Sequence, residues 1–368
     1  MPKLCCVFNT PSLYREIIYT RIDKEYDCDW YFEDADSKLV EFNTGKLKCT
    51  KRLKTKNLGA FYWVKGTLSL LRRKEYTQYL MMGATRNLST LAFLLLKKVF
   101  YPKKRAYLWT HGFYGKETFV EGVVKRLLLN SADELLIYGD YACNMMLRMG
   151  FRKERLHAIH NSLDYDTQLA IRNHITLSDI YKKHFRNDNP VLIFIGRLTK
   201  VKKLGMLVNA VAELKAHGEN YNLVFVGDGV ERENIEMLVR EKEVEKQVWF
   251  YGGCYDENAN AELIYNADLC VAPGNIGLTA IHSLAFGCPA LTHGDFSHQM
   301  PEFEVIKDEV TGTFFERDNL NSMCAAISKW FGTMSAKRNE VRQACYNVID
   351  TEWNPDYQMH ILNQIIRQ

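Results

Sequence analysis

Short apolar runs alternate with longer amphipathic stretches throughout the second half of this chain. Residues 191–195, 221–226, 248–251 and 267–273 are apolar runs of strand length, and residues 231–242 between them have helical spacing. Parallel strands need crossover helices, so this order predicts a parallel, doubly wound α/β sheet.

The first half has the same alternation. A helical stretch covers residues 12–22. The runs of strand character are residues 3–8, 30–32, 79–82, 106–110, 134–138 and 156–161. We therefore predict an N-terminal α/β domain over 1–164, a second domain over 165–350, and a C-terminal helix within 351–368. Asn354-Pro355 is the start signal of that last helix.

The bulk composition fits a two-domain globular protein. The chain has 368 residues, of which 47% are hydrophobic. The first residues are too short an apolar run for a signal-peptide core, and no stretch reaches the roughly 20 apolar residues that span a bilayer. Ten cysteines follow no disulfide or zinc spacing. We expect a cytoplasmic protein.

Charge divides unevenly along the chain. Residues 1–164 hold 28 lysines and arginines against 17 acids, whereas residues 165–368 hold 20 against 27. Cations cluster at 51–56, 72–74, 97–98 and 103–105, beside the apolar runs 88–96 and 99–101. This pattern is typical of a surface that lies on anionic lipid, at the inner face of the cell membrane. A solvated basic face is the alternative, and no nucleic-acid module accompanies the charge.

Two segments have the character of phosphate sites. Gly196-Arg197 follows the strand at 191–195, and Lys202 comes five positions after Arg197, which places two cations at the edge of an α/β sheet. Residues 274–279 follow the strand at 267–273 and open a helix, whose first backbone N–H groups would face an anion. Together they predict a nucleotide site.

These residues, taken as a set, resemble the GT-B glycosyltransferases of the large retaining group called family 4 or group 1. The resemblance covers roughly the C-terminal half. It is carried by Gly196, Arg197, Lys202, residues 226–229, residues 265–268, Pro273, Gly277, Leu278, residues 285–289, Glu304 and Gly312. It implies two Rossmann-like domains facing across a cleft, with the acceptor bound by the first and the nucleotide-sugar donor by the second. Residues 156–164 also resemble the element that ends the family's N-terminal domain, with Ser162 in place of a glycine.

The resemblance also implies site residues. The expected catalytic residues are His111, Arg197, Lys202 and Glu304. The expected donor-binding residues are Gly196, Gly227, Gly252, Gly274, Asn275, Gly277, Leu278, Thr279 and His282. The guanidinium of Arg197 and the ammonium of Lys202 would stabilise the departing diphosphate, where negative charge builds up. His111 ends a buried strand, where α/β folds place their sites.

The chain departs from the family at two positions. Most members carry two glutamates separated by seven residues, one near the transferred sugar and one at the ribose. Gly274 and His282 occupy these positions here. His282 either bonds the donor or is an ordinary core or surface histidine. Glu302 or Glu304 would compensate for the missing sugar-facing acid.

The leading hypothesis is a retaining glycosyltransferase that moves a sugar, with UDP the expected carrier, to a lipid-linked or other glycan acceptor in surface polysaccharide or glycan biosynthesis. By the resemblance, the departing phosphate would take the acceptor's proton, so no dedicated general base is needed. The resemblance also implies that neither a metal nor another cofactor is required. Asp34-Ala35-Asp36 is interpreted as an acidic turn and not as a metal motif. The alternatives are a non-catalytic nucleotide-sugar-binding partner of another transferase and a sugar-nucleotide epimerase.

Overall fold

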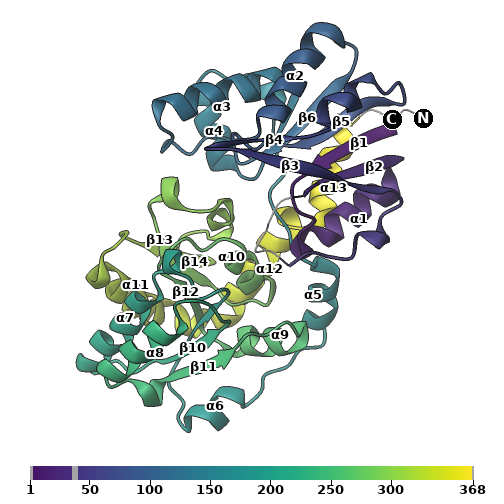
Figure 1. The fold of residues 1–368 in the computed structure, drawn as a ribbon. Helices are drawn as coiled ribbons and strands as arrows, with labels where there is room; N and C mark the ends of the chain where they lie inside the picture. Colours follow the sequence, from purple (N-terminus) through teal and green to yellow (C-terminus); the bar gives the residue numbers. More distant parts are fainter. Residues whose placement is uncertain (1–2, 35–39, 367–368) are drawn as a thin grey trace. The chain divides into compact units, whose positions relative to one another are not determined.

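The computed structural model describes residues 3–34 and 40–366, and it divides into two compact units (Figure 1). Unit 1 comprises residues 1–164 and 354–368, and unit 2 comprises residues 165–353. Each unit is built around one largely parallel sheet with helices packed against it. The prediction of two doubly wound α/β domains is confirmed. Residues 35 and 36 of the acidic turn lie outside the described residues.

The sheet of unit 1 has the order β4-β3-β2-β1-β5-β6-β7-β8. Its strands are β1 (Lys3–Phe8), β2 (Cys28–Asp34), β3 (Thr50–Leu58), β4 (Phe61–Val64), β5 (Tyr76–Met82), β6 (Arg105–Thr110), β7 (Glu134–Ile137) and β8 (Leu156–Ala158). All pairs are parallel except β3 with β4. Alternate residues of β1 enter different cores: Cys5 and Val7 pack on one face of the sheet, and Leu4, Cys6 and Phe8 on the other.

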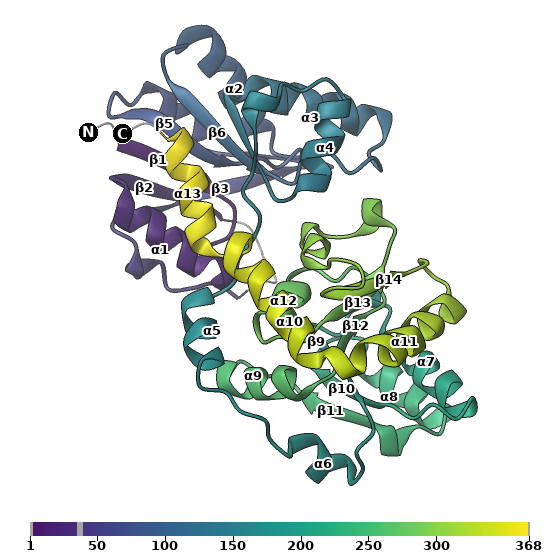
Figure 2. The ribbon, with the colours of Figure 1, turned by 180° about the vertical axis from the view of Figure 1, so that it is seen from behind.

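The α-helices among the described residues of unit 1 are α1 (Glu16–Glu25), α2 (Leu88–Phe100), α3 (Phe119–Ser131), α4 (Asp140–Arg148) and α13 (Pro355–Ile365). The start of α13 is at the predicted signal, because the Asn354 side chain accepts a hydrogen bond from the Tyr357 backbone and Pro355 is the first helical residue. Leu362 and Ile365 of α13 join the same core as Ile18 of α1, which brings the end of the chain back to its beginning (Figure 2).

The sheet of unit 2 is entirely parallel, in the order β11-β10-β9-β12-β13-β14. Its strands are β9 (Val191–Ile195), β10 (Asn222–Val226), β11 (Val248–Gly252), β12 (Leu269–Ala272), β13 (Ala290–His293) and β14 (Gly312–Phe315). Its helices are α5 (Tyr165–Arg172), α6 (Ile180–Phe185), α7 (Leu204–Ala216), α8 (Arg232–Glu241), α9 (Glu257–Asn266), α10 (Leu278–Ala285), α11 (Leu320–Met334) and α12 (Arg338–Glu352). Strand order reverses between β9 and β12, and ligands of such sheets bind at this reversal.

The hairpin of β3 and β4 was not predicted. β3 is mostly exposed and carries the cations of 51–56, so its sequence lacks the apolar alternation by which a half-buried strand is recognised. Two of the clustered cations do not belong to an exposed basic face. Lys97 is buried in an ion pair with Asp133, and the Lys104 ammonium donates to the backbone carbonyls of Leu71 and Arg73.

Within the described residues, none of the helices combines the length and the apolar character that a bilayer crossing requires.

Candidate active site

Two loops of unit 2 meet at the strand-order reversal, at the carboxyl edge of the sheet. One follows β9 and contains Gly196, Arg197 and the 3₁₀ turn Lys200–Lys202. The other, residues 273–277, connects β12 to α10. The Gly274 N–H donates to the Lys202 carbonyl over 3.0 Å, so the two loops are bonded through their backbones. The sequence-predicted phosphate segments are therefore side by side.

Lys202 connects the loops a second time through its side chain. Its ammonium donates to the Asn275 carbonyl at 2.7 Å and to the Ile276 carbonyl at 3.2 Å. An ammonium has three donors, so a further acceptor can be bound without breaking either bond. The charge is thereby held at the start of α10.

Burial changes the titration of this ammonium. Desolvation lowers the pKa of Lys202 to about 8, the charge of Arg197 lowers it further, and the charge of Glu302 opposes both. Arg197 itself is exposed. An anion that arrives here would meet one cation held by hydrogen bonds, Lys202, and one exposed cation, Arg197.

The backbone at Gly274 has no space for a side chain. A Cβ atom built on Gly274 would lie 2.0 Å from the Val201 carbonyl oxygen and 2.8 Å from backbone atoms of Lys202. The glutamate that most family members carry here is thus excluded by the close approach of the first loop. The absence of a glutamate at this position is therefore linked to the hydrogen bond between the two loops, which only glycine allows.

Gln299 anchors the second loop, and sequence reasoning missed it. Its carbonyl accepts from the Ile276 N–H at 3.0 Å, and its amide donates to the Thr292 hydroxyl at 2.9 Å and the His293 carbonyl at 3.1 Å. The side chain is 3% exposed. Its signal in the sequence was weak, because a lone glutamine in a polar loop has no motif.

We expect Gln299→Leu to lower the free energy of unfolding by about 3 kcal/mol, because it leaves several buried groups without partners at roughly 1–3 kcal/mol each. Chemical denaturation measures this. Gln247→Leu is the matched control, since Gln247 is also buried but its amide holds one carbonyl, that of Tyr221. Equal losses in the two variants would contradict the anchoring role.

The N-terminus of α10 faces the same loops. Gly277 precedes the helix with φ +58°, in the region that favours glycine, and a Cβ there would lie 3.8 Å from the Lys202 ammonium. The hydroxyl of Thr279 donates to the Ile195 carbonyl at 2.7 Å, which fixes the first turn of α10 to the end of β9. Leu278 is half-buried in this turn.

Three predicted glycines end successive strands at this edge. Gly196, Gly227 and Gly252 stand at the ends of β9, β10 and β11, and the Gly227 N–H donates to the Gly252 carbonyl at 2.7 Å. The Gly196 N–H donates to the Val226 carbonyl at 2.9 Å. Backbone hydrogen bonds therefore join the ends of these three strands along the carboxyl edge of the sheet.

His282 lies within α10 and is paired with an acid. Its Nε2 is 3.0 Å from a carboxylate oxygen of Glu257, and the same oxygen accepts from the Gln168 amide at 2.9 Å. Burial raises the pKa of Glu257, but the bonds from His282 and Gln168 outweigh it and the net shift is downward. The chain thus places a carboxylate beside the position where the family has its second glutamate.

Both candidate glutamates lie in the 3₁₀ turn Pro301–Val305. Glu302 is 2% exposed, and its negative charge raises the pKa of Lys202. Glu304 is half-buried in the same turn. Glu302 is therefore the acid whose charge acts on the Lys202 loop.

His111 belongs to unit 1, directly after β6. Its ring lies 4.6 Å from the ring of Tyr138. Desolvation lowers the pKa of His111 to about 4, and the charges of Arg15, Lys125 and Lys116 act in the same direction. The imidazole is neutral at pH 7, so it can both accept and donate a hydrogen bond.

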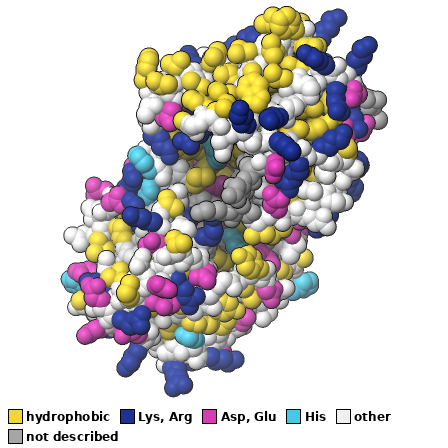
Figure 3. All heavy atoms as spheres, in the orientation of Figure 1, with side chains coloured by type: hydrophobic (Ala, Val, Ile, Leu, Met, Phe, Trp, Pro, Cys, Tyr) yellow, Lys and Arg dark blue, Asp and Glu magenta, His cyan; other side chains and the backbone are white. Residues whose placement is uncertain are grey.

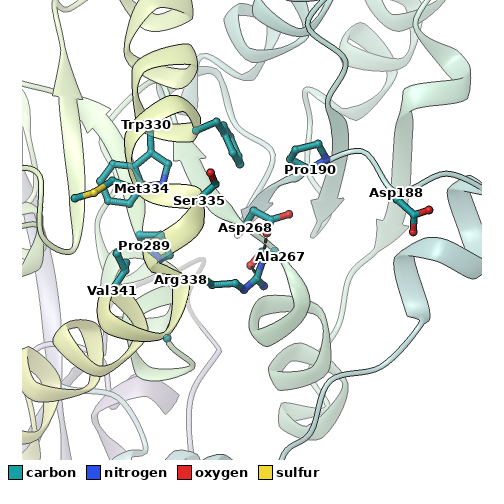
Figure 4. A pocket seen from close by; sticks show the side chains of 12 residues that line it. Asp188, Pro190, Ala267, Asp268, Pro289, Trp330, Met334, Ser335, Arg338 and Val341 are labelled. Atoms are coloured by element: carbon teal, nitrogen blue, oxygen red, sulfur yellow. Dashed lines mark hydrogen bonds and ion pairs between the residues drawn. The ribbon is translucent and has the colours of Figure 1, made fainter.

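A cavity of about 220 Å³ in unit 2 lies away from this site (Figure 4). It is lined by Pro190, Asp268 and Pro289, which precede β9, β12 and β13, and by Arg338, which forms an ion pair with Asp268. It therefore opens at the amino edge of the sheet, opposite the phosphate loops. We do not assign the candidate site to it.

Comparison with known proteins agrees with this picture. Residues 178–347 match the family described as "Glycosyl transferases group 1". Over 169 residues the chain is 28% identical to the putative glycosyltransferase EpsD of Bacillus subtilis, covering 45% of this chain and 42% of EpsD. Over 104 residues it is 35% identical to a GDP-mannose-dependent alpha-(1-6)-phosphatidylinositol dimannoside mannosyltransferase of Mycobacterium tuberculosis, covering 27% and 26%. The matches thus span less than half of these relatives.

The whole fold has solved counterparts. The Anabaena protein Alr3699/HepE, solved in complex with UDP, superposes with a TM-score of 0.75 over 99% of both chains, at 14% identity. This likeness shows the fold, which is GT-B.

Proposed function

We propose that this chain, which has the GT-B fold and matches the group 1 glycosyltransferases over residues 178–347, transfers a sugar from a nucleotide diphosphate donor to a glycan acceptor, with retention of configuration. The observation that carries the proposal is the Lys202 ammonium fixed on the carbonyls that precede α10. Gly277, Leu278 and Thr279 would hold the diphosphate, and Arg197 would close on it.

The chemistry follows from where the charge develops. The bond between the sugar's anomeric carbon and the diphosphate oxygen breaks, and its electron pair leaves with the diphosphate. The acceptor oxygen bonds to the anomeric carbon on the same face, and its proton passes to the departing phosphate. Lys202 and Arg197 stabilise the anion that forms, so no metal is needed for this step. Glu302 and the His282–Glu257 pair replace the family's two glutamates in holding sugar and ribose.

The comparisons support our choice of donor base and acceptor class. Uridine is our choice of base, because the similar Anabaena protein was solved with UDP. A lipid-linked acceptor agrees with the phosphatidylinositol dimannoside named for the mycobacterial relative. His111, neutral at the end of β6, would contact the transferred sugar.

The pKa of Lys202 predicts a pH dependence. With the free pKa at about 8, the ammonium is charged below that pH, and a bound diphosphate raises its pKa. The dissociation constant for UDP should therefore be flat below pH 8 and increase as the pH rises above it. Calorimetric titrations from pH 6.5 to 9.5 measure this, and Lys202→Arg should remove the increase.

Peripheral membrane contact is proposed through α2 and α3, which pack together in unit 1. Their exposed large hydrophobic residues are Leu95, Leu96, Val99, Phe100, Phe119, Val120, Val123 and Leu127. Lys98, Lys103 and Arg126 are exposed nearby, and Glu121 is the one acid in the two helices. Figure 3 shows hydrophobic and cationic side chains gathered over this part of unit 1. Such a face suits the anionic cytoplasmic leaflet.

Val99→Glu with Phe100→Glu should reduce partitioning to vesicles of anionic lipid by about 100-fold, because each buried side chain contributes roughly 1.5–3 kcal/mol. Sedimentation with vesicles measures this. The control is Leu177→Glu with Met237→Glu, which changes two exposed hydrophobic residues of unit 2. If both double variants bind vesicles as the wild type does, α2 and α3 are not the surface that contacts the membrane.

The proposed function is tested by release of nucleoside diphosphate. The full chain is incubated with UDP-sugars and lipid-linked acceptors, and release that depends on acceptor supports transfer. Donor binding without release would indicate a binding partner, and turnover of donor in water alone would indicate an epimerase.

A further inference from the structure

Arg15 of unit 1 is a buried cation without an acidic partner. It lies in the 3₁₀ turn Leu13–Arg15 that follows β1, and it is 5% exposed. In the part of the chain that the structure describes, no aspartate or glutamate pairs with it. Removal of such a charge from water costs several kcal/mol unless it is compensated. The position therefore needs an explanation beyond packing.

The groups that surround this guanidinium are phenols. Nε donates to the Tyr14 hydroxyl at 3.1 Å, Nη1 donates to the Tyr19 hydroxyl at 3.1 Å, and Nη2 donates to the Tyr138 hydroxyl. Each phenol uses its oxygen as acceptor. Within residues 3–34 and 40–366, none of the three hydroxyl protons has an acceptor. The Arg15 cluster, meaning Arg15, Tyr14, Tyr19 and Tyr138, thus presents donors only, and its complement is an oxyanion.

The cluster lies where α/β proteins bind ligands. Arg15 follows β1, its Nη1 is 3.9 Å from the sulfur of Met82 at the end of β5, and Tyr138 follows β7. Tyr14 is half-buried, so the cluster reaches the surface at this residue. The ring of His111 packs on that of Tyr138. The potential here is positive, since the charges that act on His111 are all cations.

We propose that the Arg15 cluster binds a phosphate group, and that this phosphate belongs to the acceptor. The second part rests on the proposed function, in which unit 1 receives the acceptor. It narrows the acceptor class to phosphate-bearing molecules, such as a sugar linked to a lipid through phosphate.

A structural tether would be built differently, as another arginine of unit 1 illustrates. Arg73 also donates to a phenol, that of Tyr31, at 3.2 Å. Its side chain is 40% exposed and has the Glu75 carboxylate at 3.8 Å. Its charge is compensated by water and an acid, whereas that of Arg15 is compensated by neither.

The binding test uses pyrophosphate, with no donor or acceptor present. The donor site is first removed by Arg197→Ala with Lys202→Ala. Pyrophosphate, against chloride at equal ionic strength, should still raise the unfolding temperature of this parent. Adding Arg15→Met should abolish the rise, and adding Arg73→Met should leave it. An unchanged rise with Arg15→Met, or no rise in the parent, overturns the proposal.

Tyr138→Phe covers the case in which Arg15→Met fails to fold. It removes one hydroxyl and keeps the ring, and it should weaken pyrophosphate binding about tenfold, which corresponds to roughly 1.4 kcal/mol. Unchanged binding in Tyr138→Phe overturns the proposal equally.

Steady-state kinetics then show whether the phosphate bound by the Arg15 cluster belongs to the acceptor or to the donor. If it is the acceptor's, Tyr138→Phe raises the KM for acceptor and leaves the KM for donor unchanged. A rise in the donor KM alone overturns the acceptor assignment. Failure of the proposed function gives a different result, namely pyrophosphate binding at Arg15 without transfer by any variant.

Discussion

Lys202→Met should lower kcat about 100-fold to 1,000-fold, the usual cost of one donor that stabilises a developing oxyanion. The methionine keeps the side chain to within one atom of its length and removes the ammonium with its bonds to Asn275 and Ile276. Desolvation, which lowers the pKa of Lys202, offsets part of the hydrogen-bond energy that is lost, so the loss of fold stability should stay small beside the loss of rate. Initial rates with saturating donor, together with the unfolding temperature, measure both effects.

Lys200→Met is the control for this prediction. Lys200 lies in the same 3₁₀ turn and is exposed, so its removal changes the net charge equally without touching the second loop. The kcat of Lys200→Met should stay near that of the wild type. Equal rates for the two variants would mean that Lys202 does not act on the departing group.

Gly274→Glu should inactivate the protein, although it restores the glutamate that most family members carry. Any side chain here collides with the Val201 carbonyl at 2.0 Å and with the Lys202 backbone, and backbone atoms cannot rotate away. Gly274→Ala should already cost more than about 3 kcal/mol of unfolding free energy, the range of severe steric defects. Chemical denaturation and donor binding measure these losses.

Gly253→Ala is the matched change. A Cβ on Gly253 meets no atom closer than 3.9 Å, so this variant should retain the stability of the wild type. Gain of activity in Gly274→Glu would contradict the structure of the two loops, because it would show that the first loop can withdraw from Gly274.

The sequence was most informative where local pattern and burial coincide. Residues 191–195 were predicted as a strand because every residue of β9 is buried in a sheet covered on both faces. The Asn354-Pro355 start of α13 was equally clear, since capping is a local property. β3 was missed because its register is set by pairing with β2 and β4, which a sequence of exposed cations does not reveal.

For the candidate site, the sequence identified individual residues but not the hydrogen bonds that join them. Arg197, Lys202 and Gly277 were named from spacing, whereas the bonds of Lys202 to Asn275 and Ile276 depend on how two loops distant in sequence meet. Gln299 and Glu257 were missed for the same reason. Gln299 holds the Ile276 N–H, 23 residues away, and Glu257 meets His282, 25 residues away, and no local motif records such partners.

The most direct test of the central claim is calorimetric titration of the wild type and Lys202→Met with UDP, GDP and ADP. The account predicts that the wild type binds one nucleoside diphosphate selectively, with UDP favoured, and that Lys202→Met weakens that binding about tenfold or more, at roughly 1.4 kcal/mol per factor of ten. Absence of binding by every nucleoside diphosphate, or equal binding in both proteins, would contradict a donor site built on Lys202.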